Sequence, residues 1–114
     1  MKSLTSICIV PTENFKKEAK ILSKKYLSFE DDLEEVIKDI YEKPRYGISL
    51  GHNCYKIRFA IKSKNSGKSG GARLVTLVKI VNNTVYLLSV FDKSHKDSVS
   101  DSELAEIIKE IHFI

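Results

Sequence analysis

The chain has 114 residues and a formal net charge of +4, with 42% hydrophobic and 30% charged residues. This length predicts one domain spanning residues 1–114 with a modest core, and the globular composition excludes an intrinsically disordered protein. The apolar runs are too short to span a bilayer or to form a signal peptide, so we expect a cytoplasmic protein with no membrane partner. The two cysteines, Cys8 and Cys54, are far apart in the sequence and indicate reduced, mostly buried thiols.

The N-terminal half predicts one strand and two helices. Residues 4–10 (LTSICIV) have the composition of a short strand that ends before a proline. Residues 12–26 and 28–42 carry apolar side chains at helical spacing, and Ser28 with Asp31 resembles a capping box at the start of the second helix. Because almost no linker separates the two helices, we expect them to form an antiparallel hairpin.

The C-terminal half predicts three strands in a meander and a final helix. Residues 54–62 alternate between apolar and basic side chains, and residues 72–81 form the nearly continuous apolar run of a central strand. Residues 84–92 return after an Asn-Asn turn, and a capping box opens a helix over residues 100–112. The expected class is α+β, in the order β-α-α-β-β-β-α, with an antiparallel meander sheet and the helices packed on one of its faces.

The segment KSKNSGKSGGARL (62–74) contains the letters GKS, which also occur in nucleotide-binding loops. That motif needs a glycine separated from the Gly-Lys pair by four residues, where this chain has Lys62, and it needs a helix after the loop. Residues 72–81 have the composition of a strand instead, so the sequence excludes a phosphate-binding loop. It predicts a mobile hairpin tip between two strands.

Positive charge is concentrated in the second half of the chain. Residues 55–96 contain nine lysines and arginines and a single acid, Asp92. Antiparallel pairing should bring Lys62, Arg73 and Lys93 to one end of the sheet. Such a local excess is typical of proteins that bind nucleic acid or another polyanion, although a solvated outer sheet face would carry it too. The histidines and cysteines lack the spacing of metal ligands, so we expect neither a metal nor another cofactor.

The segment GHNCYKIRFAIKSKNSGKSGGARL, the strand ending VFDKSHKD and the capped final helix together resemble the RelE/HigB toxins of bacterial type II toxin–antitoxin systems. The GKSGGARL loop is typical of a HigB-like branch, and the likeness is strongest over residues 51–110. The resemblance implies the RelE-like, microbial ribonuclease-like fold. It also implies an endoribonuclease that cuts mRNA on the ribosome without metal, by attack of a 2′-OH on the neighbouring phosphate. The implied partners are the ribosome-bound mRNA and a cognate antitoxin, expected to be of the helix-turn-helix type.

The same resemblance implies four catalytic residues. Lys56 and Arg58 in YKIR match the family's pair of strand lysines. Arg73 in GGARL matches its phosphate-binding arginine, and Lys93 matches the basic residue after the last strand. The residues expected to bind the flanking RNA are Lys62, Lys64, Lys68, Phe91, His95 and Lys96.

The general acid and base stay open at this point. Some relatives carry a tyrosine near the start of the final helix for proton transfer, where this chain has Val99. Lys56, Lys93 or His95 could transfer the protons instead, or the rate could depend on positioning and charge alone. Two other functions are compatible with the sequence. One is a ParE-like toxin that inhibits gyrase, and the other is a non-catalytic RNA-binding module whose binding depends strongly on salt.

Overall fold

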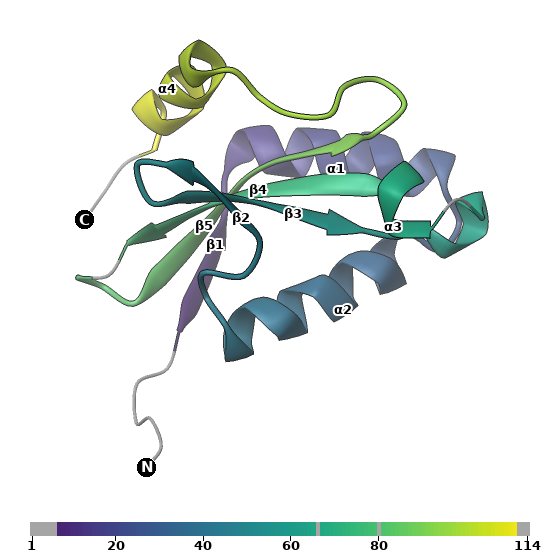
Figure 1. The fold of residues 1–114 in the computed structure, drawn as a ribbon, viewed down its shortest axis with the longest axis horizontal. Helices are drawn as coiled ribbons and strands as arrows, with labels where there is room; N and C mark the ends of the chain where they lie inside the picture. The colour runs from purple at the N-terminus through teal and green to yellow at the C-terminus, as the bar shows by residue number, and fades with distance from the viewer. Residues whose placement is uncertain (1–6, 66, 80, 112–114) are drawn as a thin grey trace.

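The computed structural model describes residues 7–65, 67–79 and 81–111 and contains a five-stranded sheet in the order β1-β5-β4-β3-β2 (Figure 1). The strands are β1 (Cys8–Pro11), β2 (Ile48–Gly51), β3 (Cys54–Phe59), β4 (Ala72–Lys79) and β5 (Thr84–Asp92). The helices are α1 (Glu13–Lys25), α2 (Phe29–Glu42), the short α3 (Gly67–Gly70) and α4 (Asp101–Lys109), with a 3-10 turn, η1, at Lys62–Lys64. Parts of three predicted elements, at residues 4–6, 80 and 112, lie outside the described residues.

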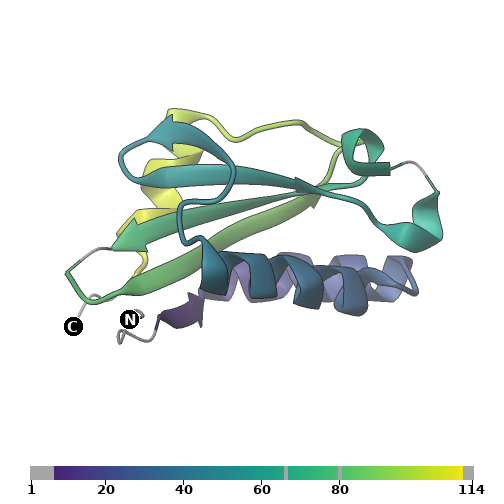
Figure 2. The same cartoon turned by 60° about the horizontal axis from the view of Figure 1, so that its bottom comes forward.

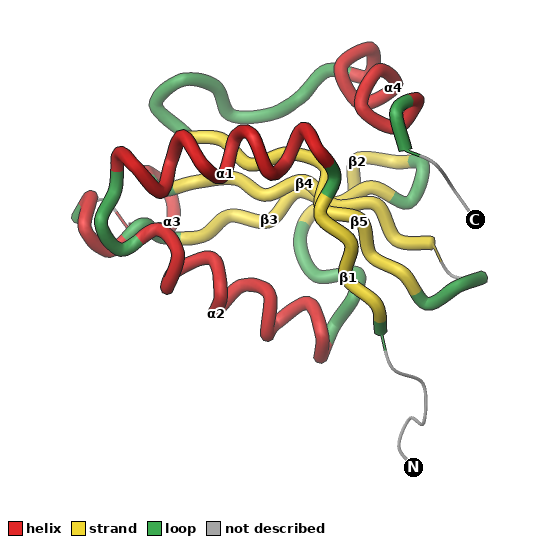
Figure 3. The backbone as a smooth tube through the Cα atoms, turned by 180° about the vertical axis from the view of Figure 1, so that it is seen from behind, coloured by secondary structure: helices red, strands yellow, loops and turns green. Residues whose placement is uncertain are grey.

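The predicted α+β class and the β3-β4-β5 meander are confirmed, but the sheet is mixed rather than antiparallel. β1 pairs with β5 in parallel, with Cys8 opposite Thr84 and Val10 opposite Tyr86, as Figure 3 shows from behind. β2 was not predicted. It is joined to β3 by a tight turn in which His52 and Asn53 both have positive φ angles.

The helix boundaries follow the local capping signals in two of the three long helices. Thr12 accepts a hydrogen bond from the backbone N–H of Phe15 at the start of α1. At the start of α4, Ser100 and Glu103 form the predicted capping box. The predicted capping box at α2 is wrong, because the Ser28 hydroxyl donates to Asp32 at 2.6 Å and makes no cap hydrogen bond.

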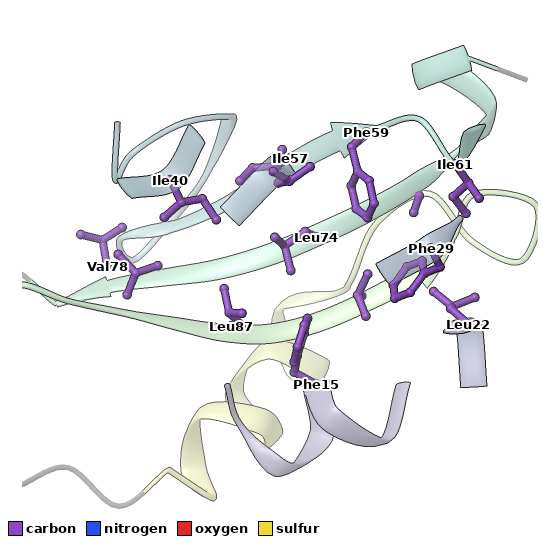
Figure 4. Close-up of a cluster of buried hydrophobic side chains, with 14 residues drawn as sticks. Phe15, Leu22, Phe29, Ile40, Ile57, Phe59, Ile61, Leu74, Val78 and Leu87 are labelled. Atoms are coloured by element: carbon purple, nitrogen blue, oxygen red, sulfur yellow. The ribbon is translucent and has the colours of Figure 1, made fainter. Parts of the chain in front are cut away.

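The helices lie on both faces of the sheet, so the expectation that they share one face is wrong for α4. Figure 2 shows α1 and α2 side by side along one face. There Phe15, Leu22, Phe29 and Ile40 pack against sheet residues in the larger apolar cluster, drawn in Figure 4. Burying each such side chain contributes about 1.5–3 kcal/mol. On the opposite face, Leu104 of α4 belongs to a second cluster with Val75 and Leu88.

The glycine-rich segment contains a 3-10 turn and a one-turn helix, which the prediction of a hairpin tip did not include. Between β3 and β4 the chain forms η1 and the single-turn helix α3. Gly71 then passes so close to β3 that a Cβ atom placed on it would lie 2.2 Å from the carbonyl oxygen of Phe59. Only glycine fits this position, so the close approach of the backbone fixes where β4 begins.

Both cysteines are free thiols, as predicted, but they differ in burial. Cys54 is buried, and burial raises the pKa of its thiol, whereas Cys8 on the edge strand β1 is exposed, contrary to the expectation. No helix within the described residues is long and apolar enough to cross a membrane.

Candidate active site

The register of the sheet places three of the four predicted catalytic residues on one face, and the fourth, Lys93, follows the end of β5. Arg58 of β3 lies directly opposite Arg73 of β4, and Arg73 lies opposite Phe91 of β5. Lys56 precedes Arg58 by two residues and therefore projects from the same face. This is the face on which α4 packs, away from α1 and α2.

Arg73 is buried at this face, with only 2% of its surface exposed. Its Nε donates to the Asp97 carboxylate at 3.0 Å. Its two Nη atoms donate to the backbone carbonyls of Lys68 (3.1 Å), Ala72 (3.2 Å) and Ser69 (3.1 Å). The guanidinium thus joins α3 to the segment that links β5 with α4, which in Figure 1 runs from the α3 end of the sheet back to α4.

Lys56 is also buried and converges on the same acid. Its Nζ donates to the Asp97 carbonyl oxygen at 3.0 Å and lies 3.9 Å from the carboxylate. The hydrogen bond from Arg73, together with the charges of Lys56, Arg73 and Lys93, lowers the pKa of Asp97. Sequence reasoning missed Asp97, whose only signal was an acid inside the basic segment KSHKD.

Lys64, predicted to bind RNA, is paired with the buried Asp92 in the free chain. Its Nζ donates at 2.6 Å both to the Asp92 carboxylate and to the carbonyl of Gly70. Asp92 is 1% exposed and also accepts hydrogen bonds from the Tyr26 hydroxyl and from the N–H and hydroxyl of Ser94. Burial alone would raise the pKa of Asp92, but the hydrogen bonds from Lys64, Tyr26 and Ser94 outweigh it and hold that pKa well below its usual range. We call the set of Tyr26, Lys64, Gly70, Asp92 and Ser94 the Asp92 network. It connects the glycine-rich segment to the end of β5.

Most of the other predicted RNA-binding residues are exposed, and several have protein partners. Lys62 lies 3.6 Å from Glu35 of α2. The Lys96 ammonium lies 4.8 Å above the ring of Phe91 and pairs with Glu103 at 3.1 Å, so Phe91 is buried beneath it. The side chains with the greatest freedom to meet a polyanion are the exposed Arg58, Lys68, Lys93 and His95.

Two further expectations concern the same region. Val99, at the position where some relatives have a tyrosine, packs in the apolar cluster that contains Leu104. Among the described residues, no group of three or more histidine, cysteine, aspartate or glutamate side chains gathers in the way a metal ion requires.

Comparisons with known proteins agree with the fold. The family model described as "RelE toxin of RelE / RelB toxin-antitoxin system" matches residues 9–112. A mutant of E. coli toxin RelE in the free state is 23% identical with a TM-score of 0.62, and the match covers 95% of this chain and 100% of that one. A chain of the intact E. coli RelBE toxin–antitoxin complex is 22% identical with a TM-score of 0.54, covering 76% of this chain and 96% of that one. The isolated E. coli RelE toxin is 18% identical with a TM-score of 0.54, covering 93% of this chain and 100% of that one. No curated sequence matches significantly.

Proposed function

This chain belongs to the RelE toxin family, and on that premise we propose that it is an endoribonuclease that cuts mRNA on the ribosome and so inhibits translation. The observation that carries the proposal is the convergence of two buried cations, Arg73 and Lys56, on one carboxylate, that of Asp97. A site that holds a carboxylate in this way has the charge and the hydrogen-bond donors to hold a phosphate.

The proposed reaction is attack of a 2′-OH on its own 3′-phosphate, which produces a 2′,3′-cyclic phosphate and a free 5′-OH. The pentacoordinate transition state carries more negative charge than the starting diester, so donors placed at its oxygens lower the barrier. Arg73 and Lys56 are those donors in the proposal, and Arg58, directly across from Arg73, adds a third cation. A proton must leave the 2′-OH and another must reach the departing 5′-oxygen. Lys56, Lys93 and His95 are the candidates for these transfers.

Exposed cations around this site would bind the RNA on either side of the cut. Lys68 of α3 and Lys62 of η1 are exposed near Arg58. The three cations line a cavity of about 220 Å³ next to β3, together with the acids Asp32, Glu35 and Asp39 of α2. His95 and Lys96 follow β5 on the other side. Lys64 contributes indirectly in this proposal, because its ammonium holds the glycine-rich segment through Asp92 and Gly70.

We also propose a protein partner that silences the toxin. E. coli RelE has been solved in a complex with the antitoxin RelB and with an antitoxin RelB peptide. By analogy, this chain has a cognate antitoxin, which we expect to be of the helix-turn-helix type and to cover the basic face. The proposed place of action is the cytoplasm, where ribosomes and mRNA are found.

The test expresses the wild-type chain and the double variant Arg58→Ala/Arg73→Ala and maps the 3′ ends of ribosome-bound mRNA. The wild type should stop translation and leave new ends bearing a cyclic phosphate. The double variant should reduce cleavage by at least about 100-fold, the usual effect of removing a donor to the transition state. Arg45→Ala, which removes an exposed arginine outside the site, is the matched control and should cleave normally.

Arg73 also ties two segments together, so circular dichroism should first confirm that each variant is folded. The single variant Arg58→Ala removes an exposed side chain and separates a catalytic loss from a folding loss. If the folded double variant stays as toxic as the wild type, the proposed site is wrong. DNA damage without mRNA cleavage would indicate a gyrase-inhibiting toxin, and RNA binding without new ends would indicate a non-catalytic RNA-binding module.

A further inference from the structure

We propose that Asp97 is an internal counter-anion that holds the site closed in the free protein, so that an RNA phosphate must replace its carboxylate on Arg73 and Lys56. This inference rests on the proposed function and concerns the regulation of the same site. It explains why the two cations that the chemistry needs are 2% and 8% exposed in the free chain.

Four of the five N–H donors of Arg73 have protein acceptors, so the guanidinium has little capacity left for a phosphate while Asp97 stays in place. Nε donates to Asp97, and the Nη atoms donate to backbone carbonyls around α3. The Lys56 ammonium is directed to the backbone and the carboxylate of the same residue. One residue therefore covers both cations, and its removal would free both at once.

Asp97 is the contact that can be exchanged. The Nη partners of Arg73 are backbone carbonyls of Lys68, Ser69 and Ala72, which belong to α3 and to the start of β4. Asp97 instead lies in a segment without regular secondary structure, and 53% of its side chain is exposed. Because half of the Asp97 side chain is exposed, water can replace part of its contact with Arg73, which makes this ion pair easier to exchange than a fully buried one. An incoming phosphate offers more acceptor oxygens than the Asp97 carboxylate. It can approach this contact from the solvent, because Asp97 is half exposed.

The segment around Asp97 is anchored on both sides of this residue. Residues 94–96 are held by hydrogen bonds from their backbone N–H groups to Asp92. Ser100 caps α4. Between these anchors, Asp97 supplies the polar contacts with the sheet. Val99 packs in the apolar cluster that contains Leu104, so the segment can move at residues 97 and 98 without unfolding β5 or α4.

The charges at this site favour the exchange. Lys93 adds a third positive charge to the two buried cations, and Asp97 is the acid they share. Removing the Asp97 charge should leave the cations with a stronger attraction for any other anion. Because Asp97 also satisfies Arg73 and Lys56, the same change should lower the stability of the free chain.

The test compares Asp97→Asn with Asp101→Asn, a matched control that removes the same charge four residues away at the exposed start of α4. The probe is a short RNA with 2′-O-methyl groups, which cannot be cut. Asp97→Asn should bind it about three- to fivefold more tightly than the wild type, the upper part of the range expected from losing a half-exposed competing ion pair, and Asp101→Asn within about twofold of the wild type. If Asp97→Asn binds no more tightly than Asp101→Asn, the inference is wrong.

A second measurement does not depend on RNA. The NMR signal of the Arg73 Nε–H reports its acceptor, and inorganic phosphate is the probe. Phosphate should shift this signal in Asp97→Asn at a concentration at least about threefold lower than in the wild type; equal responses would overturn the inference. If the asparagine variant does not fold, Asp97→Ser repeats both measurements.

The two proposals fail in different ways. If the wild type cuts ribosome-bound mRNA and the Asp97 variants show no gain in binding, the closed-site inference fails and the proposed function stands. If no variant binds or cuts RNA, the proposed function fails, and the phosphate titration of the Arg73 signal still decides whether Asp97 closes the site.

Discussion

Replacing Asp92 with asparagine should lower the free energy of unfolding by about 2–4 kcal/mol. Removing one partner of a buried ion pair costs about 3–5 kcal/mol, because the other charge is left in a poorly solvated place. Here the remaining Lys64 is 19% exposed, so it regains some hydration. The asparagine also keeps one oxygen that can accept from Lys64 or Ser94. These two effects reduce the expected loss in the free energy of unfolding to about 2–4 kcal/mol.

The stability difference between the wild type and Asp92→Asn should become smaller as the pH falls. The pKa of Asp92 is lower in the folded chain than its ordinary value of 3.8, so its stabilising effect is fully present above that value. As the pH falls below it, the unfolded chain takes up a proton that the folded chain does not, and the effect is lost progressively. The difference between wild type and Asp92→Asn should therefore be constant from pH 7 to 5 and should narrow by about 1 kcal/mol by pH 3.

The assay is urea denaturation followed by far-ultraviolet circular dichroism at each pH. Asp31→Asn, which removes an exposed carboxylate from α2, is the control and should change stability by less than about 1 kcal/mol. The reasoning about the Asp92 network is refuted if Asp92→Asn loses less than about 1 kcal/mol at pH 7. It is also refuted if the gap between variant and wild type does not narrow in acid.

Two further predictions concern backbone geometry and capping. Gly71→Ala should destabilise the chain by about 1–3 kcal/mol or more in urea, because the new methyl group meets the Phe59 carbonyl, which cannot move aside. Gly67→Ala, where the methyl group meets open space and only the positive φ is strained, should cost less; equal losses would contradict the close-approach argument. Ser100→Ala should cost about 0.5–2 kcal/mol and speed hydrogen exchange in α4, and unchanged exchange there would show that the capping box does not stabilise the helix.

The elements that could be predicted are those whose signals are local. α1 was expected over 12–26 and occupies Glu13–Lys25, since a capping threonine and an apolar stripe at helical spacing are sufficient to place it. β5 occupies the predicted residues 84–92, because a run of apolar residues between a tight turn and a polar loop has few other structures available. These patterns involve residues that are close in the sequence, so a single sequence is sufficient to predict the elements.

The errors in the fold come from contacts between distant residues. β1 has the composition of a strand, but nothing within it says that it pairs with β5, more than seventy residues later, or that the pairing is parallel. The apolar stripe of α4 predicts a buried face without saying which side of the sheet it meets. β2 has only four residues, including a glycine and a serine, which is too short for a periodic signal.

At the candidate site, too, the sequence did not predict contacts between distant residues, in this case the ion pairs. The charge count over residues 55–96 predicts a strong positive electrostatic potential, which depends on the summed charge and not on individual contacts. Which of these cations are free to bind an anion depends on their distances to individual carboxylates. Asp92 was one acid among nine cations in that count, yet it pairs with Lys64 at 2.6 Å and holds this side chain largely buried. Asp97, just beyond the counted segment, does the same to Arg73 and Lys56.

Asp97 therefore divides the cations of the candidate site into two groups with different roles under the proposed function. Arg58, Lys68 and Lys93 are exposed and can attract RNA from a distance, where charge matters more than geometry. Arg73 and Lys56 are held by Asp97 at fixed positions on adjacent strands, which is the preorganisation that stabilising a transition state requires. The same contacts keep these two residues from meeting a phosphate until Asp97 moves. Preorganisation and closure are thus two consequences of one ion pair, so a variant at Asp97 should bind RNA more tightly while positioning it less accurately.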